Sequence, residues 1–150
     1  TNPVIEILNK LDFIEYWEFA PIYYSFYLPN DPQFIQQWYH NNIKSELAWD
    51  LAKGSANVKI AIIDDAILLN HEDLKNKIWV NTSEIPNNNI DDDNNGYIDD
   101  YKGYDVGNSD GNPNPPNNRN LNHFNHGSHV AGIAAGETNN NKGISSIGFN

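Results

Sequence analysis

The chain has 150 residues, of which 39% are hydrophobic, with a net charge of −11 and an isoelectric point near 4.6. The hydrophobic share is large enough for a packed core, which excludes wholesale disorder. The acidic charge argues against a nucleic-acid partner, because phosphates attract clustered Lys and Arg. The absence of cysteine excludes disulfides and thiolate chemistry, and no apolar run is long enough to span a membrane.

The N-terminal part of the chain contains two short patterns and one capped helix. Residues 2–10 carry apolar side chains at helical spacing, and residues 13–27 are aromatic and favour β-structure. A second helix is predicted over 45–54, because Ser45 is a suitable N-cap and Gly54 a suitable stop.

The following segments predict a strand, a long loop and a helix. Residues 58–64 (VKIAIID) form a continuous apolar run, as expected of a buried parallel strand. Residues 81–125 are dense in Asn, Asp, Gly and Pro, and a loop of this length usually has a function or an ion that orders it. Residues 126–136 (HGSHVAGIAAG) are rich in small side chains and predict a helix packed closely against a sheet.

Asp64 and His126 are candidate catalytic residues. Asp64 ends the predicted strand, and functional groups in α/β sheets collect at the carboxyl ends of strands. His126 opens the predicted helix, whose positive end favours the neutral imidazole that a general base needs. These features alone also allow a simpler interpretation, in which Asp64 caps a turn and His126 caps a helix.

Two blocks resemble the subtilisin-like serine proteases. The segments AIIDDAILLNHEDL (61–74) and NHGSHVAGIAAG (125–136) are similar to the Asp and His blocks of that family, and residues 27–64 resemble the start of mature thermitase-type enzymes. The resemblance implies an α/β fold with a mostly parallel sheet and helices on both faces. It also implies a secreted or cell-surface endopeptidase that cleaves polypeptides, with Asp64 as orienting carboxylate and His126 as general base.

The third member of the triad is absent from this sequence. Nothing resembles the Gly-Thr-Ser-Met-Ala block of the family, and Ser145 and Ser146 match a loop that precedes a core strand. We therefore expect residues 1–150 to be inactive alone, with the Ser and the rest of the sheet supplied beyond residue 150 or by a second chain. The alternatives are a non-catalytic calcium-binding module and a pseudoprotease.

Asp65 departs from the usual Asp block. Most subtilisins have Ser or Thr at this position, whereas the kexin and furin branch has Asp. That resemblance implies that Asp65 lines the S2 pocket and selects Lys or Arg at P2. The alternative is that Asp65 accepts a hydrogen bond from a loop amide.

The segment that begins at Asp91 predicts a calcium site. Oxygen-bearing residues occupy loop positions 1, 3, 5 and 9, and glycine occupies position 6, where a calcium loop turns sharply. Position 12 is Lys102 instead of Glu, so an intact EF-hand is not supported, and a neighbour such as Asp100 would complete the site. The alternative is a flexible acidic loop. The predicted ligands are Asp91, Asp93, Asn95, the carbonyl of Tyr97, and Asp99.

Two further calcium sites follow from the resemblance. One resembles a calcium loop of thermitase, although Asn108 replaces an Asp there. The other matches the tight site near the mature N-terminus of the family and would take further ligands from residues 139–144. The ligands are Asp105, Asp110, Asn112 and Asn114 for the first, and Asp31 and Asp73 for the second.

Residues 1–26 resemble the last helix and strand of a subtilase propeptide, which would make the protein a zymogen. The expected domains are therefore the propeptide end at 1–26 and the N-terminal part of the catalytic domain at 27–150. Maturation cleavage is expected between Ser25 and Leu28. The alternative is an ordinary N-terminal extension of the catalytic domain.

Overall fold

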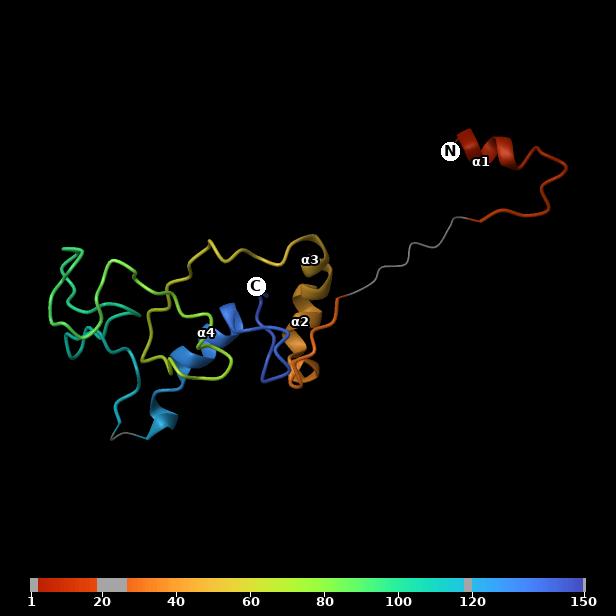
Figure 1. Ribbon diagram of the computed structural model, residues 1–150. Helices are drawn as coiled ribbons and strands as arrows, with labels where there is room; N and C mark the ends of the chain where they lie inside the picture. Colours follow the sequence, from red (N-terminus) through yellow and green to blue (C-terminus); the bar gives the residue numbers. More distant parts are fainter. Residues whose placement is uncertain (1–2, 19–26, 118–119, 150) are drawn as a thin grey trace.

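The computed structural model describes residues 3–18, 27–117 and 120–149. Within these ranges the regular elements are helical and no strand is formed, although isolated bridges pair Tyr101 with Gly103 and Asp105 with Asp110. None of the described helices has the length and apolarity needed to span a membrane. The elements are α1 (Pro3–Leu8), η1 (Phe34–Gln36), α2 (Trp38–Ile43), α3 (Ser45–Leu51), η2 (Leu121–His123) and α4 (His126–Ala135) (Figure 1).

The helix predicted over 45–54 is confirmed as α3, but its start differs from the prediction. The N-cap is Lys44, whose backbone is left-handed with φ 58°, and no side chain caps the helix. Ser45 is the first helical residue, and its hydroxyl instead bonds His40 Nδ1 at 2.8 Å. The left-handed Lys44 ends α2 and begins α3, which allows the two short helices to meet at a sharp corner.

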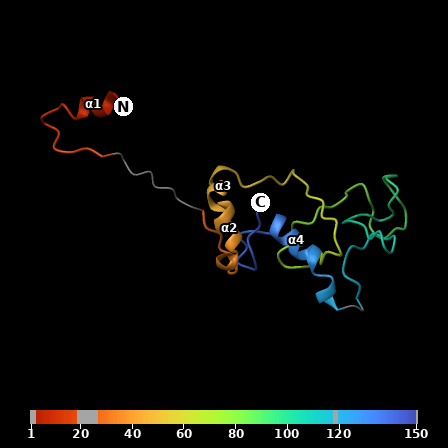
Figure 2. The same cartoon turned by 180° about the vertical axis from the view of Figure 1, so that it is seen from behind.

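The main buried cluster surrounds Trp49 of α3, which is 3% exposed. The Trp49 ring contacts Phe34, His40 and Phe149, and its indole N–H donates to the Ile147 carbonyl at 3.0 Å. Both views of the chain show its C-terminal segment beside α2 and α3 (Figures 1 and 2). The buried cluster therefore joins residues 34–49 to the C-terminal residues 147–149.

The small-residue helix predicted over 126–136 is confirmed as α4, which buries Gly127, Ala131 and Gly132. In both views α4 lies between the α2–α3 corner and the long polar loops (Figures 1 and 2). Several Asn and Asp residues of these loops have left-handed backbones, which these residue types adopt more easily than most others. They include Asn87, Asn89, Asn94 and Asp99.

The buried strand predicted over 58–64 is not formed. Val58, Ile60 and Ile63 are 69%, 54% and 97% exposed, and the segment has no pairing partner within the described ranges. A strand requires a neighbouring chain for its backbone N–H and C=O groups, whatever its side chains favour. The predicted parallel sheet is therefore not seen in the described part of the chain.

The N-terminal segment contains α1, which occupies the middle of the helix predicted over 2–10. The indole N–H of Trp17 donates to the Asn9 side chain at 2.8 Å within this segment. The β-structure predicted over 13–27 falls largely on residues 19–26, which lie outside the described residues. Residues 25 and 26 of the expected cleavage region lie outside them as well.

Candidate active site

His126 is the first residue of α4, and the loop that follows residues 58–63 packs directly on the start of this helix. A Cβ atom placed on Gly127 would lie 2.2 Å from the Ala66 carbonyl oxygen and 3.0 Å from Asp64 Cβ. Only glycine leaves room for so close an approach. The Ser128 hydroxyl adds a second contact by accepting the N–H of Leu68 at 2.9 Å. The small residues after His126 therefore bring the Asp64 loop to the histidine.

Asp64 and His126 form a close hydrogen-bonded pair. Nδ1 of His126 lies 2.8 Å from both carboxylate oxygens of Asp64. Because the ionised carboxylate only accepts hydrogen bonds, Nδ1 carries the proton and Nε2 is left as the acceptor. The Asp64 side chain is 17% exposed and the His126 side chain 71% exposed, so the imidazole is accessible to a reactant.

The electrostatics of the pair differ from the prediction made from the helix dipole. The hydrogen bond and charge of Asp64 raise the pKa of His126 above its ordinary value of 6.5, with a further contribution from Asp65. The N–H of Asp65 and the His126 bond lower the pKa of Asp64. The contact with Asp64 thus outweighs the desolvation of His126, and the pair is ionised over a wider pH range.

Asp65 lies between the two halves of this site. Its Oδ1 accepts the N–H of Gly127 at 2.9 Å and the N–H of Ala66 at 2.7 Å. The amide contact that the sequence allowed as the alternative role of Asp65 is therefore present. The S2 role requires a bound peptide and stays a prediction.

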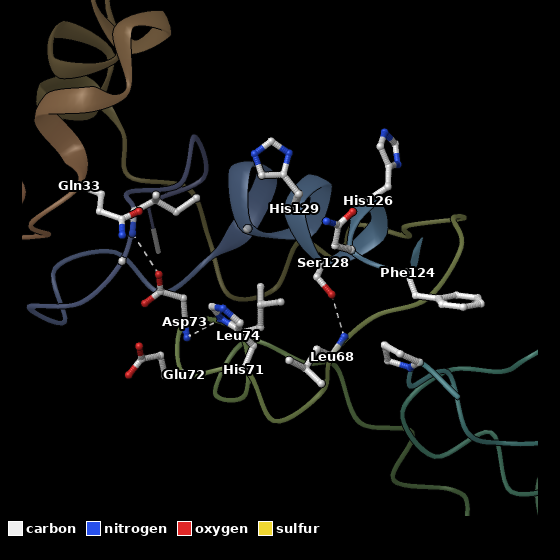
Figure 3. Close-up of a pocket in the computed structure, with 15 residues that line it drawn as sticks. Gln33, Leu68, His71, Glu72, Asp73, Leu74, Phe124, His126, Ser128 and His129 are labelled. Carbon is white, nitrogen blue, oxygen red and sulfur yellow. Dashed lines mark hydrogen bonds between the residues drawn. The ribbon is translucent and has the colours of Figure 1, made fainter. Parts of the chain in front are cut away.

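A cleft of about 620 Å³ runs beside α4 (Figure 3). Ser128 points from the helix toward Leu68 on the opposite wall, whereas His126 and His129 project away from that wall. His126 thus stands at the rim of the cleft, with its ring turned outward.

Ser145 and Ser146 have no exposed surface. The Ser145 hydroxyl donates to Asp31 at 2.7 Å, and that of Ser146 bonds Thr138 and the Phe149 N–H. Both hydroxyls are engaged in holding the loop, as expected of residues outside the nucleophile block. Neither Ser145 nor Ser146 is therefore available as the nucleophile from which His126 would take a proton.

The first predicted calcium segment brings carboxylates together, but with a different membership. Glu84, Asp93 and Asp100 place oxygen atoms within 4.8 Å of one another. Asn81 Nδ2 donates to both Asp93 and Asp100 at 2.9 Å. No salt bridge to these three carboxylates is found among the described residues. Their charges are therefore offset only by amide groups.

Glu84 was not predicted as a member of this group. It is 4% exposed, and its two oxygens accept the N–H groups of Asp92, Asp93 and Asp99. Glu84 lies before the calcium-loop motif and occupies none of its ligand positions. Only the folded structure therefore shows that it belongs to the carboxylate group. A conserved distance from the acidic motif would be the signal to seek in relatives.

The other predicted ligands of this segment serve the loop itself. Asp91 accepts the N–H groups of Asn95 and Gly96, and Asp99 accepts those of Asn88 and Asn89. The Tyr97 ring packs against Tyr104 with centroids 4.8 Å apart. Asn95 remains beside the carboxylate group, because its amide donates to Asp93 and Asp100.

The thermitase-like segment forms a compact turn without a carboxylate cluster among its described residues. Asp105 and Asp110 exchange backbone hydrogen bonds, and Oδ1 of Asp105 accepts the N–H groups of Gly107 and Asn108. These amides, that of Asn108 first, lower the pKa of Asp105. Two other predicted ligands point to backbone donors. The oxygen of Asn112 accepts the Asn114 N–H, and that of Asn114 accepts the Leu69 N–H.

Asp31 and Asp73 converge on the loop predicted to complete their site. Asn140 contacts both, because its N–H donates to Asp31 at 3.1 Å and its side-chain amide donates to Asp73 at 2.9 Å. Asp31 also accepts the N–H of Asn139, and Asp73 that of Ile144. The two buried carboxylates, from two separate segments of the chain, thus hold residues 139–144 in place.

Comparison with known proteins gives one family. Residues 55–150 match the Subtilase family. Halolysin of Haloferax mediterranei is 34% identical over 143 residues, which cover 95% of this chain and 23% of that protein. The halolysin-like extracellular serine protease Nep of Natrialba magadii is 35% identical over 136 residues, covering 91% of this chain and 21% of that protein.

Thermitase of Thermoactinomyces vulgaris matches a shorter part. It is 40% identical over 68 residues, covering 41% of this chain and 24% of that protein. The chain thus spans about a quarter of the length of these relatives. The match over residues 55–150 includes both Asp64 and His126. The chain belongs to the subtilase family of subtilisin-like serine proteases.

Proposed function

We propose that this chain is the N-terminal part of a secreted serine endopeptidase in which Asp64 and His126 act with a Ser supplied beyond residue 150. The observation that carries the proposal is the 2.8 Å contact between Asp64 and His126 Nδ1. It leaves Nε2 of an exposed imidazole free to take a proton. The extracellular description of Nep, together with the family, supports secretion.

The chemistry follows from this arrangement. Nε2 of His126 takes the hydroxyl proton as the Ser oxygen attacks the scissile carbonyl, and Asp64 stabilises the imidazolium. The same proton then passes to the leaving amine, which separates and leaves an acyl-enzyme. Water, deprotonated by His126, then attacks the ester carbonyl; the acyl part leaves as a carboxylic acid, and His126 returns the proton to the Ser oxygen. The substrate class is polypeptide, and residues 1–150 alone lack the nucleophile.

Asp65 extends the proposal to substrate selection. Its exposed position directly after Asp64 supports a contact with a basic P2 side chain. A negative charge at this position attracts a Lys or Arg side chain at P2. An apolar P2 side chain gains no such attraction, so the site would prefer basic residues. In the full-length protein, Asp65→Asn is expected to reduce the ratio of kcat/KM for Lys over Ala at P2. Equal ratios in the two proteins would remove this role.

We also propose that calcium stabilises the protein. Carboxylate oxygens are ligands that calcium prefers, and Glu84, Asp93 and Asp100 provide them in one place. Asn95 lies beside them, but its side-chain N–H groups face the carboxylates and its oxygen accepts the Tyr97 N–H. Residues 91, 97 and 99 are the further candidates from the calcium-loop pattern. Of the other two predicted sites, the one at Asp31 and Asp73 has the stronger support, because both carboxylates converge on residues 139–144.

The N-terminal segment fits a propeptide end in this proposal. Phe13 and Tyr16 are 83% and 73% exposed, which suits a segment that contacts another surface. Residues 27–150 would then begin the mature catalytic domain. N-terminal sequencing of the secreted protein tests this division, which predicts a mature start between residues 25 and 28.

A serine-directed fluorophosphonate probe tests the main proposal in the full-length protein. Labelling is expected in the wild type and is expected to fall strongly in His126→Ala, because the nucleophile loses its base. Peptide hydrolysis should fall by several orders of magnitude while the melting temperature changes little. A folded protein that is not labelled would support a pseudoprotease, and one with calcium binding but no hydrolysis a calcium-binding module.

A further inference from the structure

The first turn of α4 receives its capping oxygen from a distant part of the sequence. Its own N-cap, Asn125, makes no side-chain cap hydrogen bond. The first N–H groups of a helix have no partners within the helix, and an acidic side chain satisfies them while matching the helix dipole. Oδ1 of Asp65 does so at Gly127, the residue after His126.

The same carboxylate belongs to the residue that follows Asp64. The N–H of Asp65 donates to Asp64 Oδ1 at 2.8 Å, and Oδ1 of Asp65 accepts the N–H of Ala66 at 2.7 Å. Asp65 therefore bonds the catalytic carboxylate, its own loop and the helix that carries His126. A single residue links both members of the pair.

The packing around this link leaves little freedom to compensate for its loss. The Ala66 carbonyl and Asp64 Cβ approach Gly127 too closely for any side chain there. Ser128 holds the next part of the loop through Leu68. Without the Asp65 oxygen, the Gly127 N–H would face this contact unpaired, and separation of loop and helix would move Asp64 away from His126.

We propose that Asp65 is a positioning residue, which caps α4 from the catalytic loop and thereby holds Asp64 and His126 in register. The proposal rests on the proposed protease function for its kinetic readout. It differs from the S2 role, because positioning requires an acceptor oxygen whereas attraction of a basic P2 residue requires a charge. The two roles therefore separate in Asp65→Asn, which keeps the oxygen and removes the charge.

The test compares Asp65→Ala with Asp65→Asn in the full-length protein, using a peptide with Ala at P2. Asp65→Ala should lower kcat by about 10- to 100-fold with KM within about twofold, since a small misplacement of catalytic groups costs that much. Asp65→Asn should lower kcat by less than Asp65→Ala does, because it keeps the capping oxygen. Ser55→Ala is the matched control, because it removes a loop-amide acceptor from Asn57 outside the site and should change neither constant.

The proton resonance of His126 Nδ1–H gives a readout that does not depend on turnover. It should broaden or disappear in Asp65→Ala and persist in Asp65→Asn, because only the first removes the capping oxygen. If Asp65→Ala does not fold, hydrogen exchange at Gly127 decides, and its amide should be protected in both the wild type and Asp65→Asn.

Three results would overturn the positioning role: wild-type kcat and Nδ1–H signal in folded Asp65→Ala, equal losses in both variants, or an unprotected Gly127 amide in the wild type. Failure of the proposed function is distinguishable. The wild type would then show neither turnover nor probe labelling, while the Nδ1–H and Gly127 measurements would still report on the cap.

Discussion

His126 is subject to two opposing influences whose balance determines the pH at which it can act as a base. The start of α4 favours the neutral imidazole, whereas the contact with Asp64 favours the charged form. The hydrogen bond and the charge of Asp64 raise the pKa of His126. A general base works only when deprotonated, so activity should increase as pH rises through this raised pKa.

Asp64→Asn tests this assignment in the full-length protein. On acidification, the wild-type kcat/KM should begin to fall at a pH above 6.5, the ordinary pKa of histidine. Removal of the Asp64 charge should move this acid limb to lower pH and reduce kcat by about 10⁴-fold, as in other triads. The measurement is a pH series of kcat/KM. An acid limb at the same pH in both proteins would show that His126 is not the titrating base.

His40 makes a separate prediction about stability. It is 2% exposed, and burial lowers its pKa despite the opposing effects of the Ser145 carbonyl and of Glu46. Nε2–H donates to that carbonyl at 3.2 Å, so Nδ1 accepts from Ser45. The folded state thus favours neutral His40. The stability this confers is present above the unfolded pKa, near 6.5, and is lost as pH falls through the lower, folded pKa.

The His40 prediction is checked by denaturant unfolding of the full-length protein between about pH 4.5 and 8. The wild type should lose more unfolding free energy on acidification than His40→Gln, which cannot titrate but can still donate to the Ser145 carbonyl. Parallel pH curves for the two proteins would show that protonation of His40 does not limit acid stability.

At the scale of elements, local chemistry predicts helices well and loop contacts poorly. The small residues of α4 and the location of α3 are visible in the sequence, because both depend on neighbours along the chain, although the predicted Ser45 cap is not formed. The left-handed Lys44 carries no such signal. The membership of Glu84 in the carboxylate group also depends on the fold, as does the choice of Gly127 as the partner of Asp65.

The polar loop between Glu84 and Asp100 should depend on calcium for its stability. Three carboxylates within 4.8 Å repel one another, and a bound cation would offset their charges. Chelation is therefore expected to lower the melting temperature of the full-length protein. A ligand that binds only the folded state at 100 times its Kd contributes about 2.7 kcal/mol, which sets the scale of the loss. Calorimetric titration with calcium measures the site directly.

Glu84→Gln provides the specific variant for this experiment. It retains an acceptor for the loop amides but removes one of the three charges, so the effect of chelator should become smaller. Glu137→Gln is the matched control, because Glu137 accepts from Asn76 outside the group. Absence of calcium uptake by the wild type, with melting insensitive to chelator, would contradict the calcium assignments.

At the scale of the whole molecule, the family and the Asp64–His126 contact can be predicted from two short blocks of sequence, but the predicted sheet is not seen among the described residues. A continuous apolar run identifies residues 58–64 as a candidate buried strand. A strand requires pairing partners, however, and the described residues do not provide them. Residues 58–62 instead border a hollow of about 710 Å³ that also includes Leu74, Trp79 and Ala131. The apolar sequence thus predicts that the segment requires strand partners and burial, whereas the structure shows that neither is provided by the described residues.

The exposed apolar segment leads to a prediction about the isolated 1–150 polypeptide. Val58, Ile60 and Ile63 face solvent, and their backbone groups lack a strand partner in the described region. The backbone amides of residues 58–64 should therefore exchange rapidly with solvent in the isolated polypeptide. The polypeptide should also aggregate through this unpaired apolar segment. In the full-length protein the same amides should exchange slowly, because neighbouring strands would pair with them. Slow exchange along 58–64 in a soluble monomer of residues 1–150 would show that this segment finds its partners without further sequence.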